Sequence, residues 1–569
     1  MASSDFQVSG KNPNALFTLK LHRGDGMTLL GMNWKNGKPP KDFVGFGIEY
    51  KPPDEERFFP LNNRLTFPGH DGEVDPQTLS TLQSPIQKFR WVHFPRNANL
   101  DGEFLYRVTP IFMDAEDKLS QGEPQEAAIE LRRETFPGQL NVTFTRGFVS
   151  SQAFVDRYEK FGKFTTLIPS KADQGLKFKP THPKTDEALA WMGFEAREAI
   201  LDTLDIAIKD KAEVRVVAYD LNLPEIVERL EKIGKRLKVI IDDSKEHGAK
   251  TSAESQAAKR LEKSAGKANV KRQHMGNLQH NKTIVVDGPT IQRVVFGSTN
   301  FSWRGFYVQA NNALVVDAAK PVKLARAAFD NYFDHEDSFQ DSDSAELTDL
   351  ELKDIDARVA FSPHSKSNSL LKGIGDDIED NTTSCLFYSL AFLSITPGVI
   401  KEAIKKVTRK ADMFVYGISD KKTGGIDLQK PDGNVAPVFA SALDKNIPAP
   451  FNKEPTGGGG NRMHHKFVVI DFDKPTARVY LGSYNFSVPA DGKNGENLLL
   501  IRDRRVAVSY TIEALRIFDH YHFRVAQQEA KKAKKKLQLA KPPRKAGEKA
   551  WWEEDFTNSR KIRDRELFA

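Results

Sequence analysis

The chain has 569 residues, of which 39% are hydrophobic and 28% are charged, so it can form several globular domains and is not a disordered protein. Its single cysteine, Cys385, excludes an intrachain disulfide and a cysteine-based zinc site. The longest apolar run, residues 385–397, is too short to span a bilayer, and the first residues, MASSDFQVSGKNPN, do not resemble a secretory signal. We therefore expect a cytoplasmic protein.

The excess of positive charge is small and unevenly distributed. Lysines and arginines outnumber aspartates and glutamates by 84 to 77, which gives a net charge of +7 and a pI near 9.0. The cations are concentrated in residues 245–272 and in a run near the C-terminus, formed by Lys531, Lys532, Lys534, Lys535 and Lys536. Such runs attract polyanions, but they do not distinguish nucleic acid from anionic lipid.

Short segments with alternating apolar residues recur over residues 15–147, for example ALFTLKLH, FVGFGIEY, EFLYRVTPIF and LNVTFTR. Roughly seven strands at this spacing predict an antiparallel β-sandwich, which follows a flexible N-terminus over residues 1–14. The stretch GEFLYRVTPIFMD resembles the late strand of immunoglobulin-like and fibronectin type III domains, with Tyr106 near its start. Because we find no cluster of His, Asp or Glu in this region, we expect a spacer or targeting module.

From about residue 148 the pattern changes to alternating helices and strands. Residues 186–210 have helical apolar periodicity, and the strand run VRVVAYDL follows them. A comparable order returns after residue 355. This alternation predicts two α/β lobes with mostly parallel sheets. The expected boundaries are lobes over residues 148–345 and 346–530 and a basic C-terminal tail over residues 531–569, in which Trp551 and Trp552 must pack or bind.

The two lobes carry the same polar residues in nearly fixed register. QHNKTIVVDG in the first lobe matches MHHKFVVIDF in the second, and FGSTNF matches LGSYNF. The polar residues His, Lys, Asp, Ser and Asn are the same in both copies, while the apolar residues between them differ. A repeat kept only for packing would instead keep its apolar residues and vary the polar ones. The paired positions, 184 or 185 residues apart, are His280 and His464, Lys282 and Lys466, Asp287 and Asp471, Ser298 and Ser483, Asn300 and Asn485, and Asn311 and Glu496.

These residue types suit chemistry on a phosphoryl group. In H-x-K the histidine and the lysine are two residues apart, so on a strand their side chains lie on one face. We expect the returning strand and its G-S-x-N turn to bring serine and asparagine beside them. Lysine, asparagine and serine can bind phosphoryl oxygens, while imidazole can attack phosphorus or transfer protons near neutral pH. Two copies supply the two histidines that a two-step displacement needs.

The pattern H-x-K-x4-D followed by G-S-x-N resembles the repeated signature of the phospholipase D superfamily over roughly residues 148–530. The resemblance implies the phospholipase D-like fold and hydrolysis or transfer at a phosphodiester without a metal or another cofactor. One histidine attacks phosphorus to form a phosphohistidine. The other protonates the leaving oxygen and then activates water or an alcohol. By this analogy His280 is the nucleophile and His464 is the general acid and base.

The analogy also assigns the other motif residues. The expected ligands of the phosphate oxygens are Lys282, Lys466, Asn300 and Asn485, while Ser298 and Ser483 line or orient the site. Asp287 and Asp471 end apolar strands, and we interpret them as structural residues or as indirect support of the site.

One position differs between the two copies. In the family an acidic residue after the serine–asparagine turn often supports a histidine, and Glu496 fits that role by orienting one imidazole. The first copy has Asn311 instead, to which we assign a supporting role. Asparagine can accept a hydrogen bond, but it cannot stabilise an imidazolium as a carboxylate does. The two histidines are therefore inequivalent, or the first half is weakened.

Three further features are interpreted as structural. The sequence His364-Ser365-Lys366 matches H-x-K, but neither the aspartate nor G-S-x-N follows it. On a strand, His465 points away from the face that carries His464. The run Gly457–Gly460 lacks the G-K-[ST] of a nucleotide-binding loop, so we expect a loop at the rim of the site.

The motif does not identify what the phosphate joins. A nuclease acting on DNA or RNA is favoured by the basic pI and the lysine-rich flanks. The alternative is a phospholipase D or phosphatidyl transferase, for which residues 531–536 would bind a membrane surface or anionic lipid. A second alternative is a non-catalytic binding scaffold, which the complete His and Lys pairs disfavour. The oligomeric state is left open.

Overall fold

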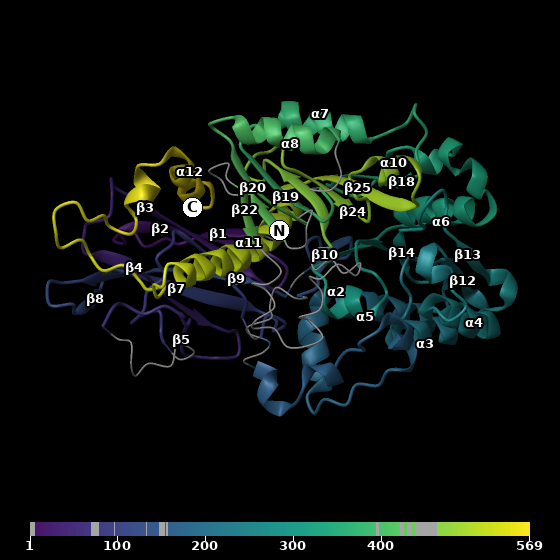
Figure 1. The fold of residues 1–569 in the computed structure, drawn as a ribbon, viewed down its shortest axis with the longest axis horizontal. Coiled ribbons are helices and arrows are strands. Elements are labelled where there is room, and N and C mark those ends of the chain that lie inside the picture. Colours follow the sequence, from purple (N-terminus) through teal and green to yellow (C-terminus); the bar gives the residue numbers. More distant parts are fainter. Residues whose placement is uncertain are drawn as a thin grey trace. The chain divides into compact units, whose positions relative to one another are not determined.

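The computed structural model of the chain describes residues 6–69, 79–95, 97–132, 134–146, 154, 157–393, 398–420, 426–429, 435–438 and 464–569. They form two compact units (Figure 1). The first unit comprises the described residues within 1–133 and 508–569, and the second comprises those within 134–430 and 435–507. Among the described helices, none is both long and apolar enough to cross a membrane.

Two antiparallel sheets form the core of the first unit. Their strands are β1 (Gln7–Ser9), β2 (Phe17–Arg23), β3 (Thr28–Trp34), β4 (Phe43–Lys51), β5 (Phe59–Pro60), β6 (Arg90–His93), β7 (Glu103–Met113), β8 (Leu119–Gln121) and β9 (Gln125–Glu130). One sheet has the order β1–β2–β3–β6, and the other has the order β5–β4–β7–β8, with β9 also paired to β7. Phe17 and Phe46, one from each sheet, lie 5.0 Å apart between ring centroids. The predicted N-terminal antiparallel β-structure is confirmed, while the immunoglobulin or fibronectin III relationship stays a prediction.

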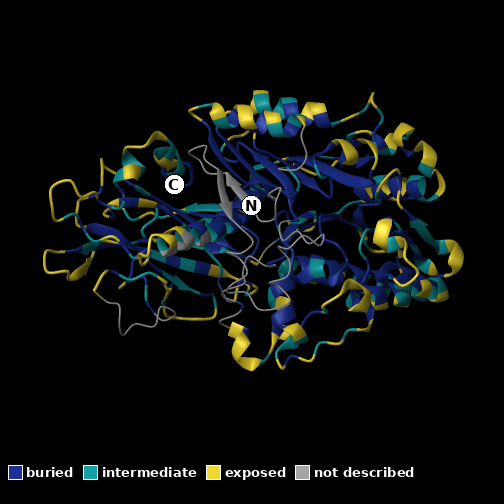
Figure 2. Ribbon diagram, viewed as in Figure 1, coloured by how far each residue is buried: buried dark blue, intermediate teal, exposed yellow. Residues whose placement is uncertain are grey.

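The C-terminal residues belong to the first unit and are not the tail that their charge suggested. After α11 (Arg504–Lys532) the chain forms the 3-10 turn η11 (Glu553–Phe556) and α12 (Ser559–Leu567). Trp552 is buried, and Trp551 donates a hydrogen bond to the carbonyl of Phe43 at 3.1 Å and stacks on Phe89. Figure 2 colours each described residue of the chain by its burial. The tryptophans add buried apolar area to the core of this unit. The free energy gained from that burial explains why this charged C-terminal segment packs on the unit.

The first lobe lies in the second unit as a seven-stranded sheet between helices. Its strands are β10 (Leu140–Phe144), β11 (Glu213–Ala218), β12 (Leu237–Asp242), β13 (Val270–Gln273), β14 (Lys282–Asp287), β15 (Gln292–Gly297) and β16 (Asn312–Asp317), in the order β10–β16–β15–β14–β11–β12–β13. Its helices are α2 (Thr185–Lys209), α3 (Pro224–Ile233), α4 (Ala253–Ala265), α5 (Trp303–Tyr307) and α6 (Ala319–Asp334).

The second lobe contains a nine-stranded sheet of comparable design. Its strands are β17 (Thr348–Asp349), β18 (Asp356–Ser362), β19 (Cys385–Leu390), β20 (Phe414–Asp420), β21 (Ile426–Gln429), β22 (Val435–Val438), β23 (Lys466–Ile470), β24 (Arg478–Gly482) and β25 (Glu496–Arg502). The order is β17–β18–β25–β24–β23–β19–β20–β21–β22. Its helices are α7 (Leu371–Asn381), α8 (Val399–Arg409) and α10 (Val488–Gly492).

Both sheets are mixed, whereas we expected them to be mostly parallel. In the first lobe β11 runs parallel to β12, and β12 to β13, but β14, β15 and β16 pair antiparallel. The second lobe likewise has a parallel pair, β19 and β20, and an antiparallel pair, β23 and β24. The short turns after the two H-x-K strands cause the difference, because a short turn can join antiparallel strands only.

The segment LNVTFTR also lies in a different place from the one we expected. We assigned it to the sandwich, but it forms β10, which pairs antiparallel with β16 at the edge of the first-lobe sheet. The hydroxyl of Thr143 donates a hydrogen bond to the carbonyl of Ala313 at 2.7 Å. Alternation of apolar and polar residues predicts a half-buried strand, but it does not predict which sheet the strand joins.

The two lobes meet where their motif strands begin. The backbone N–H of Gly495 donates to the carbonyl of Leu278 at 2.9 Å, and that of His464 donates to the carbonyl of Ala310 at 3.3 Å. These reciprocal bonds place the approach to each H-x-K strand beside the residues that follow G-S-x-N in the opposite lobe.

The two motif aspartates, Asp287 and Asp471, end these strands at the edge away from the histidines. Asp471 is fully buried and accepts bonds of 2.7 to 3.1 Å from the backbone N–H groups of residues 383–385 and the hydroxyl of Thr383. Asp287 is half-buried and pairs with the half-exposed Arg326 at 2.8 Å. Asp471 therefore fixes the start of β19, while Asp287 makes a surface ion pair.

This difference predicts unequal effects on stability. Replacing Asp471 by alanine leaves several buried N–H groups unpaired and should destabilise the second unit by about 3 kcal/mol. The matched Asp287→Ala variant loses a surface ion pair and should cost less than about 1 kcal/mol. Urea unfolding, followed by tryptophan fluorescence and circular dichroism, measures both. Equal losses in the two variants would contradict the assignment.

Candidate active site

His280 and His464 lie close together, one from each lobe. Their ring centroids are 6.1 Å apart, and both residues are buried. The lysines of the two motifs begin β14 and β23 and are buried as well. The ammonium group of Lys466 donates to the carbonyl of His464 at 2.7 Å, and Lys282 makes the equivalent bond to His280. The two H-x-K motifs thus form one buried site.

The imidazole of His280 is held by a carboxylate from the other lobe. Its Nδ1 lies 2.7 Å from Oε2 of Glu496, which is fully buried. The amide of Asn494 donates to Oε1 of Glu496 at 3.2 Å, and Asn277 of the first lobe donates to Asn494 at 3.1 Å. Because Nδ1 of His280 carries the proton in the bond to Glu496, its Nε2 retains the lone pair that a nucleophile requires.

The imidazole of His464 is held by an amide from the first lobe. Its Nδ1 lies 2.8 Å from Oδ1 of Asn311 and 3.2 Å from the carbonyl oxygen of Ser298. The Asn311 amide nitrogen donates to the carbonyl of Gly305 at 2.9 Å, which turns Oδ1 toward the histidine. Asn311 therefore contacts His464 directly, in the position that Glu496 holds for His280.

Burial governs the protonation of this site. It lowers the pKa of His280 to about 4, a shift that Glu496 opposes and Lys282 reinforces. It lowers the pKa of His464 well below its usual value, and the charge of Lys466 adds to this shift. Burial also lowers the pKa of Lys282 to about 7. Both imidazoles are therefore neutral at pH 7 in the free site, and an anionic phosphate would raise their pKa values by charge attraction.

The motif serines orient the groups that hold the histidines. The hydroxyl of Ser298 donates to Oδ1 of Asn311 at 3.0 Å. The hydroxyl of Ser483 accepts the backbone N–H of Asn497 at 2.9 Å and helps to keep the pKa of Glu496 low. The amide of Asn497 also donates to Oδ1 of Asn281 at 2.7 Å, which links the two lobes. Sequence reasoning missed Asn281 and Asn497, although each stands next to a motif residue.

Among the residues that the structure describes, each motif asparagine has a side-chain oxygen without a hydrogen-bond partner. Within the described part of the chain, Oδ1 of Asn300 and Oδ1 of Asn485 are buried and have no hydrogen-bond partner. Each oxygen can accept a hydrogen bond, whereas the donor that a phosphate oxygen requires is the amide nitrogen of the same side chain. Asp287 and Asp471, at the opposite ends of β14 and β23, do not support the histidines, so their role is structural.

Tyr219, which follows β11, packs beside His280. Its ring centroid lies 4.8 Å from that of His280 and 4.7 Å from that of His247. The Lys282 ammonium lies 4.8 Å from the Tyr219 ring centroid. Sequence reasoning missed Tyr219. It is the first residue after a buried strand, and functional residues of α/β proteins gather at such strand ends.

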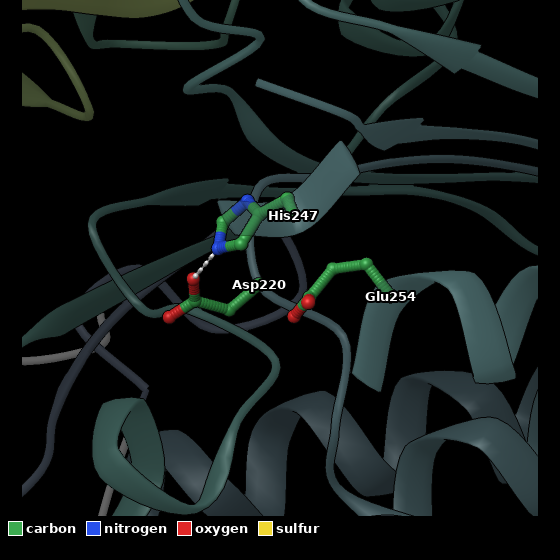
Figure 3. Close-up of side chains that lie close together, drawn as sticks. All are labelled: Asp220, His247 and Glu254. Atoms are coloured by element: carbon green, nitrogen blue, oxygen red, sulfur yellow. Dashed lines mark ion pairs between the residues drawn. The ribbon is translucent and has the colours of Figure 1, made fainter. Parts of the chain in front are cut away.

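A charged cluster adjoins this tyrosine. Asp220, His247 and Glu254 bring possible metal-ligand atoms within 4.8 Å of one another (Figure 3). Nδ1 of His247 lies 2.8 Å from Asp242, and its Nε2 lies 3.3 Å from Asp220. Burial opposes protonation of His247, but the hydrogen bonds to Asp220 and Asp242 raise its pKa to about 10. The cluster therefore carries its own cation, an imidazolium between two carboxylates.

The other histidines singled out in the sequence have structural partners. His364 is buried and pairs through Nδ1 with Asp491 at 2.8 Å. His465 is buried, with its ring centroid 5.2 Å from Phe467 and 5.8 Å from Phe144. The glycine run Gly457–Gly460 lies outside the described residues.

Two solved structures are similar to parts of this chain. Phosphatidylserine synthase from Haemophilus influenzae Rd KW20 matches with a TM-score of 0.40 and 14% identity, over 59% of this chain and 92% of that chain. The phospholipase D family member NUC from Salmonella typhimurium matches with a TM-score of 0.20 and 27% identity, over 25% of this chain and 86% of that chain.

Sequence comparisons match parts of the chain to known proteins. Phospholipase D from Rickettsia prowazekii (strain Madrid E) is 49% identical over 47 residues, which is 8% of this chain and 21% of that protein. The chain thus spans about a fifth of the length of this curated relative. The family model "Cardiolipin synthase, PLD-like domain" matches twice, at residues 198–333 and 377–518, so that each copy contains one H-x-K and G-S-x-N set. The chain thus carries two segments that match the phospholipase D-like domain.

Proposed function

We propose that the chain is a metal-independent phosphodiesterase that cleaves nucleic acid through a phosphohistidine on His280. The observation that carries the proposal is the pair of buried imidazoles, 6.1 Å apart between centroids, each of which is held at Nδ1 by an acceptor from the opposite lobe. This arrangement leaves two Nε2 atoms for the reaction. The lysines and the motif asparagines supply hydrogen-bond donors for the phosphate oxygens.

The first step transfers the phosphoryl group to the protein. Nε2 of His280 attacks phosphorus with its lone pair and forms the P–N bond. The P–O bond to the leaving group breaks, and the leaving oxygen takes the proton from Nε2 of protonated His464. The substrate anion makes this protonation possible, because it counteracts the burial and the lysine charges that lower the pKa of His464.

The second step releases the product. Nε2 of His464, now neutral, takes a proton from water as the water oxygen attacks phosphorus. The P–N bond breaks, and its electron pair returns to Nε2 of His280. The site regains its starting protonation state, so no redox partner or further group is consumed.

The unequal supports favour His280 as the nucleophile. An imidazole that attacks phosphorus becomes cationic, and the ionised Glu496 carboxylate stabilises that cation. The other imidazole must give up its proton readily, and the neutral amide of Asn311 does not hold it back. This difference gives a physical reason for assigning His280 as the nucleophile and His464 as the general acid and base.

Nucleic acid is the proposed substrate because of the charge of the chain. A net charge of +7 suits a polyanion whose phosphates repeat along a strand. The alternative substrate, a phospholipid, requires a surface that binds a membrane, since an enzyme that acts on lipids works at the membrane interface.

A substrate panel tests the proposal. In excess EDTA the wild-type chain should cleave labelled single-stranded or double-stranded DNA or RNA, and the His464→Ala variant should lose nearly all turnover. Mixed phospholipid vesicles are assayed in parallel for headgroup release. Release of a headgroup without cleavage of nucleic acid would replace the nuclease by the phospholipase. Loss of activity in EDTA that returns with added metal would contradict the two-histidine mechanism.

The supports of the histidines predict opposite pH shifts. Glu496→Gln removes the charge that raises the pKa of His280, so the acid limb of kcat/KM, where His280 must be neutral, should move to lower pH. The rate should fall about tenfold or more, because the cation formed on attack is less stable. Asn311→Asp raises the pKa of His464 and should move the basic limb to higher pH. Profiles measured with a small diester would contradict the roles if both variants moved the same limb.

A further inference from the structure

A strongly basic segment precedes α2 in the first lobe. Residues 157–184, called the basic segment here, contain seven cations and two acidic residues. The cations are Arg157, Lys160, Lys163, Lys171, Lys177, Lys179 and Lys184, and the acids are Glu159 and Asp173. The excess is five positive charges in 28 residues, in a chain whose net charge is +7.

The lysines of the basic segment are available to a partner. Five of them, namely Lys160, Lys163, Lys171, Lys177 and Lys179, are exposed and form no ion pair within the described part of the chain. An exposed lysine without a carboxylate partner keeps its full charge for a ligand. Phosphates are the anions for which such a row of point charges is suited.

An aromatic ring stands among these lysines. Phe161 is 41% exposed, and the ammonium groups of Lys160 and Lys184 lie 5.2 Å and 5.6 Å from its ring centroid. The neighbouring Phe164 is buried and stacks on His182 with ring centroids 6.2 Å apart. Residues 159–165 line a surface hollow of about 530 Å³. The backbone is thus held in place while one ring remains open to solvent.

The basic segment is fixed to the residues that follow β11 and β15 in the sheet that carries the active site. The indole of Trp303, three residues after Asn300, donates to the carbonyl of Gly175 at 3.0 Å. A Cβ at Gly175 would lie 2.7 Å from the carbonyl oxygen of Asn222, three residues after Tyr219, so glycine permits this close approach. The segment is therefore attached to residues adjacent to the catalytic motif.

We infer that the basic segment is the surface on which a single strand of nucleic acid is bound beside the active site. The lysines contact successive phosphates, and Phe161 stacks on a base, which is the combination used to bind single strands without sequence preference. The inference rests on the proposed nuclease function and adds a strand type and a location to it.

A membrane surface fits this segment less well. Insertion into a bilayer gains free energy from apolar area. Here Phe161 is exposed, but its apolar neighbours Phe164, Leu167, Ile168 and Leu176 are buried in the protein. One half-exposed ring supplies little apolar area, whereas several exposed lysines without ion pairs in the described part of the chain suit the repeated phosphates of a strand.

The test measures binding without cleavage, in the full chain with His280→Ala. The probes are oligo(dT) and vesicles of phosphatidylcholine with phosphatidylserine. The variant Lys160→Gln, Lys163→Gln, Lys179→Gln is compared with Lys232→Gln, Lys235→Gln, Lys267→Gln. The second set removes three exposed lysines that form no ion pair among the described residues and that precede β12 or β13. Thermal unfolding midpoints check that both variants fold.

The expected result is a change in the salt dependence of binding. Removal of three phosphate contacts should reduce the slope of log K against log salt concentration by about two for the basic-segment variant, and the control variant should keep the wild-type slope. Phe161→Ala should weaken oligo(dT) binding about tenfold.

Three results would overturn the inference. They are no binding of oligo(dT), an equal slope in both lysine variants, and vesicle binding that depends on the basic segment while oligo(dT) binding does not. Hydrolysis of bis(p-nitrophenyl) phosphate by the wild-type chain, measured separately, tests the proposed phosphodiesterase itself. Activity on this ester with an unchanged slope would therefore overturn the binding surface alone.

Discussion

The hydrogen bond between Glu496 and His280 joins the two lobes and determines how the site works. Its 2.7 Å length connects a carboxylate of the second lobe to an imidazole of the first, and both groups are buried. The reciprocal bond from His464 to Asn311 completes the exchange. Neither lobe can therefore form its half of the site alone, because the group that orients each histidine belongs to the other lobe. The reciprocal backbone bonds at the starts of β14 and β23 set the distance between the lobes at which both bonds form.

Burial and asymmetry together explain the chemistry proposed for this site. Removal of water lowers the pKa of both histidines and of Lys282, so the free site holds less positive charge than its residue types suggest. A phosphate anion restores the protonated states, which couples substrate binding to activation of the general acid. The carboxylate on one side and the amide on the other then give the two imidazoles different tasks. A site built from two identical halves would not divide the tasks of the two imidazoles in this way.

The sequence predicted the motif residues and the two supporting residues, Glu496 and Asn311, but not which histidine each of them supports. The H-x-K and G-S-x-N spacing predicted which residues gather within each lobe, since strand periodicity and a tight turn are local properties, and the pairing of His280 with His464 was predicted from the repeat and the family resemblance. Which imidazole Glu496 serves depends on how the lobes pack, and that is not encoded in spacing. Asp287 and Asp471 look equivalent in the sequence, yet the backbone N–H groups that surround Asp471 come from a segment more than 80 residues away. The placement of β10 and of Trp551 likewise depends on distant partners.

The most direct test of this account identifies the histidine that carries the phosphoryl group. A diester with a nitrophenyl leaving group needs little acid assistance, so the His464→Ala variant should form the phosphohistidine and fail to hydrolyse it. Mass spectrometry under alkaline conditions, where phosphohistidine persists, locates the adduct. The account predicts a phosphoryl group on His280 in this variant and none in His280→Ala. An adduct on His464 in the His280→Ala variant would contradict it and reverse the roles of the two lobes.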